Sequence, residues 1–303
     1  MSENLLVNKT YNYTLIIPHY NISSLLGRLL KTVPQREDMQ VIVVDDCSTK
    51  DLNKLEQLRE EYPWIEWYDT GTNGGGGKAR NIGLDHAKGK YVLFADADDF
   101  FLPNLNLVLD NHKDENFDIC YLGVIALHEN SFNFWGDLNY NKILKKFKNA
   151  EDFRYKIPSP WSKLYNLDMI IKYNIKFSET IIANDIYFTT LCDYYSKKIE
   201  IDKHTIYVYV VSDNSTSHVY TVEKELIRLE ERLKCDKFLF DHNQIKLLIK
   251  KSSRGIGAIL KNATSIQIQE LYNLGEKYNI SKLEIQLSGN IFNILYNIKH
   301  LGR

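Results

Sequence analysis

The protein has 303 residues, of which 44% are hydrophobic and 25% charged, and its formal net charge is −1. That is the composition of a globular protein, and the near-zero charge disfavours nucleic acid as a partner because no large positive field is available to attract it. The four cysteines form no Cys-x-x-Cys pair, which argues against a zinc ribbon or a disulfide framework and is typical of a cytoplasmic protein.

The first part of the chain alternates apolar runs with amphipathic segments. The amino terminus does not resemble a signal peptide. Continuous apolar runs predict buried strands, and apolar residues at helical spacing predict helices. The predicted elements are, in order, a strand at 13–18, a helix capped by Asn21, a strand at 41–44, a helix capped by Ser48 or Thr49, and a short strand at 65–68.

A run of four glycines, 74–77, follows the third of these strands. Glycine permits positive φ angles and a close approach of a ligand to the backbone, so we expect an open loop here, although a flexible hairpin would explain the same run. A helix at 79–87 and a strand at 91–95 are predicted next. This alternation of strands and helices predicts an α/β fold with a mostly parallel sheet and right-handed crossovers.

Carboxylates gather where two of the apolar strands end. Asp45 and Asp46 follow one strand, and Asp96, Asp98 and Asp99 follow another. The carboxyl ends of parallel strands share one edge of the sheet, so these acids and the glycine run should converge there. Oxygen ligands at such an edge suit Mg²⁺ or Mn²⁺ shared with a substrate phosphate, whereas the alternative is an acidic turn without a ligand.

Two cations near the glycine run, Lys78 and Arg80, would lie beside these carboxylates and suit a metal-bridged diphosphate. Further along, we predict a helix from Pro103, a strand at 117–127, an irregular region at 130–149, a helix at 168–173, a helix capped by Asn184, and a strand at 205–211. Helical spacing dominates after residue 220. We therefore expect a catalytic domain at 1–220 and a small helical domain at 221–303.

No window approaches the roughly 18 consecutive apolar residues that a spanning helix needs. The basic apolar segments at 246–251 and 291–301 could instead lie on an anionic membrane surface, but packing on the catalytic domain or homodimer formation through 221–303 explains the same segments and is the favoured interpretation. We expect a cytoplasmic protein, with peripheral contact to the inner face of the membrane as an alternative.

Four ordered blocks of sequence resemble the signature blocks of family 2 glycosyltransferases with the GT-A fold. The resemblance covers residues 13–110 strongly and extends more weakly to about residue 218. The weaker segments are Trp161-Ser-Lys163-Leu-Tyr165, Asn184-Asp185-Ile-Tyr-Phe188 and Asn214-Ser215-Thr-Ser217. The four strong blocks are Thr14-Leu-Ile-Ile-Pro18-His-Tyr20-Asn21, Val41-Ile-Val-Val-Asp45-Asp46-Cys-Ser48-Thr49, Asn73-Gly-Gly-Gly-Gly-Lys78-Ala-Arg80-Asn81-Ile-Gly83 and Gly89-Lys-Tyr91-Val-Leu-Phe-Ala-Asp96-Ala-Asp98-Asp99.

The resemblance implies an inverting transfer of a sugar from a nucleotide-diphosphate donor, commonly a UDP-sugar, to a hydroxyl of a glycan or a lipid-linked acceptor. It implies that the donor is held by Pro18, Tyr20, Asp46, Gly74, Lys78, Arg80, Asp96 and Asp98. Asp98 matches the direct ligand of Mn²⁺ or Mg²⁺, with Asp96 near the ribose or the metal and Asp99 supporting both. His218 is a further candidate ligand, although a lone histidine is more often structural.

An inverting reaction also needs a general base opposite the departing diphosphate. The family places this base at the start of a helix, often in a Glu-Asp pair. Asp185 matches the second position of that pair, but Asn184 stands at the first, and Glu179 is a weaker alternative base. Trp161 is expected to be a core residue or a wall of the acceptor site.

Three rival functions share some of these features. A dinucleotide-dependent oxidoreductase is discounted, because it needs a Gly-x-Gly-x-x-Gly directly after the first strand, where this chain has Pro18-His19-Tyr20-Asn21. A haloacid-dehalogenase-like phosphatase could use Asp96 and Asp98 as nucleophile and acid, but Phe100 stands where that family has Thr or Val. The third is a sugar-nucleotide-binding protein without turnover.

Overall fold

The structure is a computed structural model, and it describes residues 10–129, 134–136, 154–212, 220–244, 256, 259–282 and 285. The chain forms two compact units, Met1–Asp213 and Asn214–Arg303. Among the described residues, no helix combines the length and the hydropathy that crossing a membrane would require. The segments at 246–251 and 291–301, and His218, lie outside the described residues.

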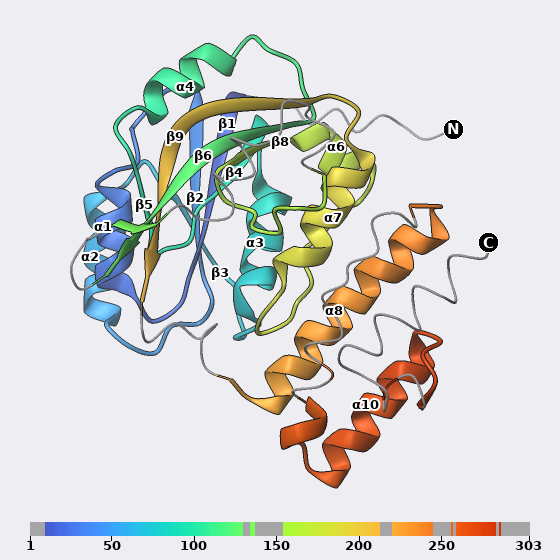
Figure 1. Ribbon diagram of the computed structural model, residues 1–303. Helices are drawn as coiled ribbons and strands as arrows, with labels where there is room; N and C mark the ends of the chain where they lie inside the picture. The colour runs from blue at the N-terminus through green and yellow to red at the C-terminus, as the bar shows by residue number, and fades with distance from the viewer. Residues whose placement is uncertain are drawn as a thin grey trace. The chain divides into compact units, whose positions relative to one another are not determined.

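The first half of the sheet contains four parallel strands in the order β3-β2-β1-β4. This arrangement confirms the alternating α/β pattern predicted from the apolar runs. Figure 1 shows α1 and α2 on one side of these strands and α3 on the other. The elements are β1 (Tyr11–His19), α1 (Ser23–Leu30), β2 (Met39–Asp45), α2 (Leu52–Glu61), β3 (Glu66–Asp69), α3 (Gly75–His86) and β4 (Gly89–Phe94).

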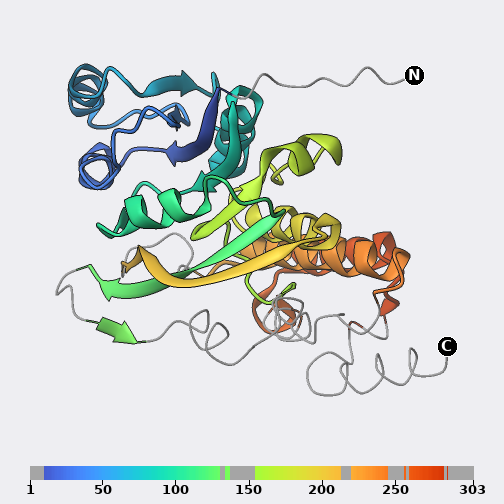
Figure 2. The same cartoon turned by 90° about the horizontal axis from the view of Figure 1, so that it is seen from above.

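The second half of the sheet is mixed, and the sequence did not predict its pairing. The order continues β4-β8-β6-β9-β5; β8 is antiparallel to both of its neighbours, whereas β6 and β9 run parallel, side by side in Figure 2. β7 extends antiparallel from β6, inside the region predicted to be irregular. The strands are β5 (Phe100–Phe101), β6 (Ile119–His128), β7 (Phe134–Gly136), β8 (Lys163–Asn166) and β9 (Ile199–Val211).

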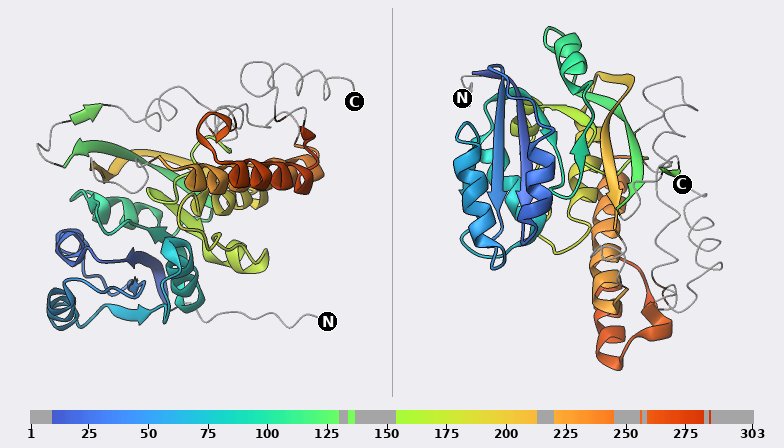
Figure 3. Two further views of the ribbon diagram at one scale, coloured as in Figure 1. Left: turned by 90° about the horizontal axis from the view of Figure 1, so that it is seen from below. Right: turned by 90° about the vertical axis from the view of Figure 1, so that its left-hand side faces the viewer.

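The described part of the first unit also contains α4 (Leu105–His112), α6 (Leu167–Lys172) and α7 (Asp185–Tyr195). Figure 3 shows the parallel strands from two further sides. The core of the unit includes the fully buried centres of β1, β2 and β4. It also includes a group of aromatic rings, one of which belongs to α7. Phe177 and Phe188 stack with their ring centroids 3.8 Å apart, and Phe94 meets both rings edge-on.

The second unit contains α8 (Val222–Asp241) and α10 (Ser265–Lys277). Apolar residues of both helices form a separate small core. Thr264 and Gln267 form a capping box at the start of α10, because each side chain pairs with the backbone of the other. Lys277 of α10 bonds Glu230 of α8 at 2.6 Å.

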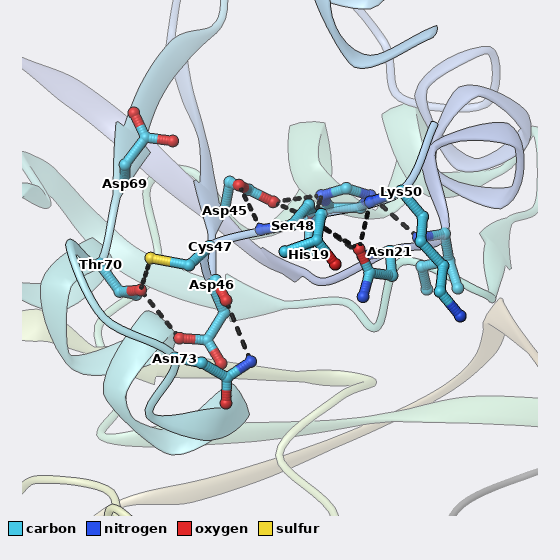
Figure 4. Close-up of polar contacts among 12 residues, drawn as sticks. His19, Asn21, Asp45, Asp46, Cys47, Ser48, Lys50, Asp69, Thr70 and Asn73 are labelled. Carbon is cyan, nitrogen blue, oxygen red and sulfur yellow. Dashed lines mark hydrogen bonds and ion pairs between the residues drawn. The ribbon is translucent and has the colours of Figure 1, made fainter. Parts of the chain in front are cut away.

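The starts of α1 and α2 differ from the prediction. Asn21 does not cap α1, which begins at Ser23; its φ of 57° is left-handed, a region that asparagine tolerates. Its side-chain oxygen instead accepts from the backbone N–H groups of Thr49 and Lys50, at 2.7 and 2.9 Å (Figure 4). Neither Ser48 nor Thr49 caps α2, whose preceding residue is Asp51. These polar side chains connect two neighbouring turns, a contact that spacing along the chain does not reveal.

Candidate active site

The carboxyl ends of β1 and β2 are joined by a buried histidine. The Nδ1 atom of His19 lies 2.8 Å from Oδ1 of Asp45, and Nε2 accepts from the backbone N–H of Ile22 at 3.3 Å. An accepting Nε2 requires the neutral imidazole with its proton on Nδ1. Burial lowers the pKa of His19, although Asp45 opposes the shift. Ser48 donates to the same carboxylate through its hydroxyl and its backbone N–H (Figure 4), so this network fixes the end of the sheet.

Asp46 caps α3. Its carboxylate accepts from the backbone N–H groups of Gly74 and Gly75, at 2.9 and 2.6 Å, and from the hydroxyl of Thr70 at 2.8 Å. The residue is only 3% exposed. The first N–H groups of a helix have no partner within the helix, so an internal carboxylate here satisfies donors that a phosphate could otherwise use. A contact of Asp46 with the nucleobase or ribose stays a prediction.

Replacing Asp46 with alanine is expected to destabilise the protein by roughly 2–4 kcal/mol, because the cap is lost and buried donors are left unpaired. Urea unfolding of the free protein would measure this change. Asp69→Ala is the control: Asp69 also ends a strand of the parallel sheet, but its side chain is exposed and pairs with Arg59 at 2.9 Å. A surface pair contributes about 0–1 kcal/mol. Equal losses in the two variants would contradict the capping role.

Asp99 is a structural acid. It is fully buried, and its two oxygens accept from the hydroxyl of Tyr207 at 2.6 Å and from the backbone N–H of Val210 at 2.7 Å. The same hydroxyl accepts from the backbone N–H of Asp96 at 2.9 Å. Burial raises the pKa of Asp99 well above its ordinary value, and the carboxylates of Asp98 and Asp96 add to the shift. These bonds attach the turn after β4 to β9.

Asp98 and Asp96 lie half-buried in that turn. Burial, with the charge of Asp96, raises the pKa of Asp98 to about 6. The Asp98 carboxylate accepts no hydrogen bond from any other residue that the structure describes, whereas its backbone carbonyl accepts from Arg28, whose guanidinium lies 5.6 Å from the centre of the Phe100 ring. Asp98 therefore carries a charge that is poorly solvated and is bonded by no other residue in the described part of the chain.

These two acids fit a divalent cation. A cation would relieve the unfavourable charge of Asp98, and Mg²⁺ and Mn²⁺ are commonly held by one or two carboxylates together with substrate phosphates. The described residues contain no cluster of three or more His, Cys, Asp or Glu side chains able to hold a metal on their own. The donor set thus suits an ion that arrives with a phosphorylated substrate.

Arg80 connects the acidic turn after β4 to the residue that precedes α7. One guanidinium nitrogen lies 2.5 Å from Oδ1 of Asp96, and another donates to Oδ1 of Asn184 at 3.0 Å. The guanidinium carbon lies 5.4 Å from the centre of the Phe177 ring. Lys78 lies two residues before Arg80 on α3, and its ammonium donates to the hydroxyl and the carbonyl of Thr72, at 2.6 and 3.1 Å; its contact with a diphosphate stays a prediction.

Asp185 is the first residue of α7 and is half-buried. Burial raises its pKa to about 6; Asp96 adds to the shift, and the charges of Arg80 and Lys163 oppose it. Its carboxylate accepts no hydrogen bond from any other residue in the described part of the chain. A carboxylate with an elevated pKa and available lone pairs is suited to take a proton near neutral pH. Glu179, the alternative base, already accepts from Asn81 at 3.3 Å.

The glycine run is not an open loop. Gly75, Gly76 and Gly77 form the first turn of α3, and this turn packs against the segment 178–184. A Cβ atom on Gly77 would fall 2.0 Å from the carbonyl oxygen of Ser178 and 3.0 Å from Cβ of Asn184. The missing side chains therefore allow the segment that carries Asp185 to approach α3.

Residues 14–173 match the family model described as glycosyl transferase family 2. The chain belongs to glycosyltransferase family 2. This result confirms that the protein is a glycosyltransferase and excludes the phosphatase and oxidoreductase alternatives.

Two bacterial relatives of this family 2 glycosyltransferase align over part of their length. The uncharacterised glycosyltransferase YibD of Escherichia coli is 23% identical over 227 residues, which are 71% of this chain and 66% of YibD. Poly(ribitol-phosphate) beta-N-acetylglucosaminyltransferase TarS of Staphylococcus aureus is 35% identical over 122 residues, which are 37% of this chain and 21% of TarS. The chain thus spans less than two thirds of these relatives.

Two solved structures share the fold. The crystal structure of S. aureus TarS 1–349 in complex with UDP-GlcNAc has a TM-score of 0.59 at 18% identity, and the alignment covers 96% of this chain and 92% of that one. A mannosyltransferase from Pyrobaculum calidifontis in complex with GDP-Man and Mn²⁺ has a TM-score of 0.56 at 15% identity, covering 99% and 90%. The similarity confirms the GT-A fold expected for a family 2 glycosyltransferase.

Within this glycosyltransferase, the structure brings Arg80, Asp96 and Asn184 into direct contact, with Asp98 and Asp185 beside them. Gly74 directly precedes α3, and its backbone N–H donates to Asp46; its contact with the donor stays a prediction. Pro18 is half-buried near the end of β1, and Tyr20 is 45% exposed just beyond it; their contact with the donor stays a prediction. Trp161 stacks on Tyr207 and Tyr209, with centroids 5.5 and 5.6 Å away.

Sequence reasoning missed two supporting residues of this glycosyltransferase. Tyr207 looks like an ordinary inward-facing strand residue, and nothing in its neighbourhood indicates that its hydroxyl bonds both Asp99 and the backbone of Asp96. Arg28 gave a weak signal, because a charged residue interrupts an otherwise apolar helix between Leu26 and Leu30.

Gly77→Ala is expected to lower kcat by roughly 10²-fold, because displacing a catalytic group by about 1 Å has that effect. Overpacking should also lower the stability by roughly 1–3 kcal/mol. Steady-state kinetics and thermal unfolding would measure the two effects. The control is Gly27→Ala, whose Cβ would meet only the Leu58 side chain at 3.2 Å, so turnover should change little. Unchanged turnover in Gly77→Ala would show that the close approach is not needed.

Proposed function

We propose that this family 2 glycosyltransferase is an inverting enzyme that moves a sugar from a nucleotide-diphosphate sugar, a UDP-sugar, to a hydroxyl group of a glycan or glycolipid acceptor. The observation that carries the proposal is the arrangement around Arg80. This residue connects the acids that suit a metal-bound diphosphate, Asp96 and Asp98, to the segment that presents Asp185. Arg80 thus links the acids that would lie beside the leaving group to the segment that would carry the base.

On the base side, Asp185 would accept the proton of the attacking acceptor hydroxyl. The oxygen then forms a bond to the anomeric carbon on the face opposite the diphosphate, while the bond from that carbon to the diphosphate oxygen breaks. The configuration at the anomeric carbon is therefore inverted. Because burial raises the pKa of Asp185 to about 6, the carboxylate is ionised at neutral pH and yet basic enough to take a proton.

On the leaving-group side, Asp98 and Asp96 would hold Mn²⁺ or Mg²⁺. A bound cation neutralises the negative charge that develops on the departing diphosphate. His218 is a further candidate ligand and lies outside the described residues. The mannosyltransferase structure in complex with GDP-Man and Mn²⁺ supports this assignment by analogy of fold alone.

The donor would extend from these acids toward the end of β1. We assign contacts with the base and ribose to Pro18, Tyr20 and Asp46, and contacts with the diphosphate to Lys78 and Arg80. A UDP-sugar is the preferred donor because TarS, which shares the fold, was crystallised in complex with UDP-GlcNAc. The acceptor would be a glycan polymer or a lipid-linked glycan, and the name of TarS, a poly(ribitol-phosphate) transferase, supports a polymer.

A thermal-shift panel of nucleotide sugars with and without Mn²⁺ tests this proposal directly. A ligand at 100 times its Kd stabilises the folded state by about 2.7 kcal/mol, so the correct donor should raise Tm, and only with the cation. Hydrolysis or transfer of that donor would then separate an enzyme from a silent binding protein. Stabilisation without any release of UDP would support the silent binder, and no stabilisation by any nucleotide sugar would refute the proposal.

A further inference from the structure

Arg80 makes a bridge between two parts of the site that are far apart in the chain. It is 7% exposed, and its guanidinium contacts Asp96, after β4, and Asn184, before α7. The Phe177 ring lies beneath it and belongs to the buried aromatic cluster. A planar guanidinium that is bonded to two partners and packed on a ring has little freedom to move. A displacement of one partner would therefore displace the other.

The Asn184 side chain bonds two other residues of the protein. Its side-chain oxygen accepts from Arg80, and its side-chain nitrogen donates to the backbone carbonyl of Thr180 at 3.2 Å. Asn184 occupies the N-cap position of α7, but its side chain does not cap the helix. Its two side-chain bonds therefore tie the backbone immediately before Asp185 to Arg80 and to Thr180.

The charges around Asp185 come from three elements. Arg80 of α3 and Lys163 of β8 lower its pKa, and Asp96, after β4, raises it, in addition to the larger effect of burial. Arg80 thus faces both carboxylates and is the stronger of the two cations acting on Asp185. A carboxylate in place of Asn184 would share the Arg80 charge and add a negative charge next to Asp185.

We propose that the hydrogen bond from Arg80 to Asn184 positions Asp185, so that Asn184 is a positioning residue for the sugar-transfer step and Arg80 links the donor-side acid Asp96 to it. This inference rests on the proposed function, because it assigns the base role to Asp185. It differs from a donor-binding role for Arg80 alone. The bridge acts through the placement of α7, and its loss should affect turnover without weakening donor binding.

Two substitutions of Asn184 distinguish the effect of its bond to Arg80 from the effect of its bond to Thr180. Asn184→Asp keeps an oxygen acceptor for Arg80 and loses the donor to Thr180, whereas Asn184→Leu has a similar volume and loses both bonds. With saturating donor at pH 8, we expect kcat of Asn184→Asp to stay within about threefold of the natural protein, and kcat of Asn184→Leu to fall roughly 10–100-fold. The donor Kd, measured by titration calorimetry with the UDP-sugar and Mn²⁺, should change less than about twofold in both.

The pH profile adds a readout that a purely structural role would not move. Asn184→Asp should shift the acid limb of kcat to higher pH, because the new carboxylate raises the pKa of Asp185. Equal loss of kcat in both variants, or no loss in Asn184→Leu, would overturn the proposal. If Asn184→Leu does not fold, Asn184→Ser replaces it with the same expectation. Retained turnover in Asp185→Asn would instead refute the proposed function, so the two failures can be told apart.

Discussion

Asp185→Asn should lower kcat by roughly 10³-fold, within the 10²–10⁴-fold range that general base catalysis supplies. Asparagine has nearly the same shape, but its amide cannot accept the proton of the acceptor hydroxyl. In the proposed arrangement the donor contacts the other side of the site, so its Kd should stay within about twofold of the natural value. Single-turnover transfer assays and calorimetric titration with the UDP-sugar would measure the two quantities.

The same carboxylate should determine the acid limb of the pH profile. The pKa of Asp185 is raised to about 6, so the base becomes protonated below that pH and kcat should fall about tenfold per pH unit. Between pH 7 and 8 the rate should be nearly flat. The control is Glu179→Gln, because Glu179 is the weaker candidate and bonds Asn81. A loss in Glu179→Gln with turnover retained in Asp185→Asn would reverse the assignment.

Asp98→Asn should abolish the stabilisation of the protein by a UDP-sugar and Mn²⁺. No other residue in the described part of the chain bonds this carboxylate, and a neutral amide is a far poorer ligand for a hard cation. At a donor concentration 100 times the natural Kd, the lost stabilisation would be about 2.7 kcal/mol. Differential scanning calorimetry with and without the cation would detect the loss, and an unchanged shift would exclude Asp98 as a ligand.

The same substitution should make the metal-free protein more stable at neutral pH. The pKa of Asp98 is raised to about 6 from an ordinary value of 3.8, so the folded state binds the proton more tightly than the unfolded state does. Its ionisation therefore reduces stability as the pH rises from about 4 through 6. In EDTA, Asp98→Asn should have the higher Tm at pH 7.5, and the difference should vanish below about pH 4. A lower Tm at pH 7.5 would contradict an unpaired charge.

The parallel half of the sheet was predictable because each of its central strands is buried on both faces. A continuous apolar run such as 41–44 or 91–95 indicates a strand that is buried on both faces. The acids after such runs could therefore be assigned to one edge of the sheet. The mixed half was not predictable. β8 is a four-residue strand antiparallel to both neighbours, and neither its length nor its spacing indicates which strands it joins.

The site residues also fall into those that the sequence predicted and those that it did not. Asp96, Asp98 and Asp185 could be found because they stand at strand or helix ends in recognisable patterns. The polar groups that hold the turns could not, because Asn21, Asp46 and Asn184 each bond residues 24 to 104 positions away. Local patterns suggested helix caps for Asn21 and Asn184 and a ligand contact for Asp46. In the structure Asn21 and Asn184 cap no helix, and all three side chains connect segments that are distant in the chain; the ligand contact of Asp46 stays a prediction.

The close packing of the first turn of α3 on 178–184 has a consequence for protein engineering. Grafting the 178–185 segment from another glycosyltransferase, in order to change the acceptor, would place foreign side chains against a surface that tolerates no Cβ at Gly77. A chimera should succeed only if residues 74–80 are transplanted together with it. The two stretches form a single exchangeable module, although nearly one hundred residues separate them in the chain.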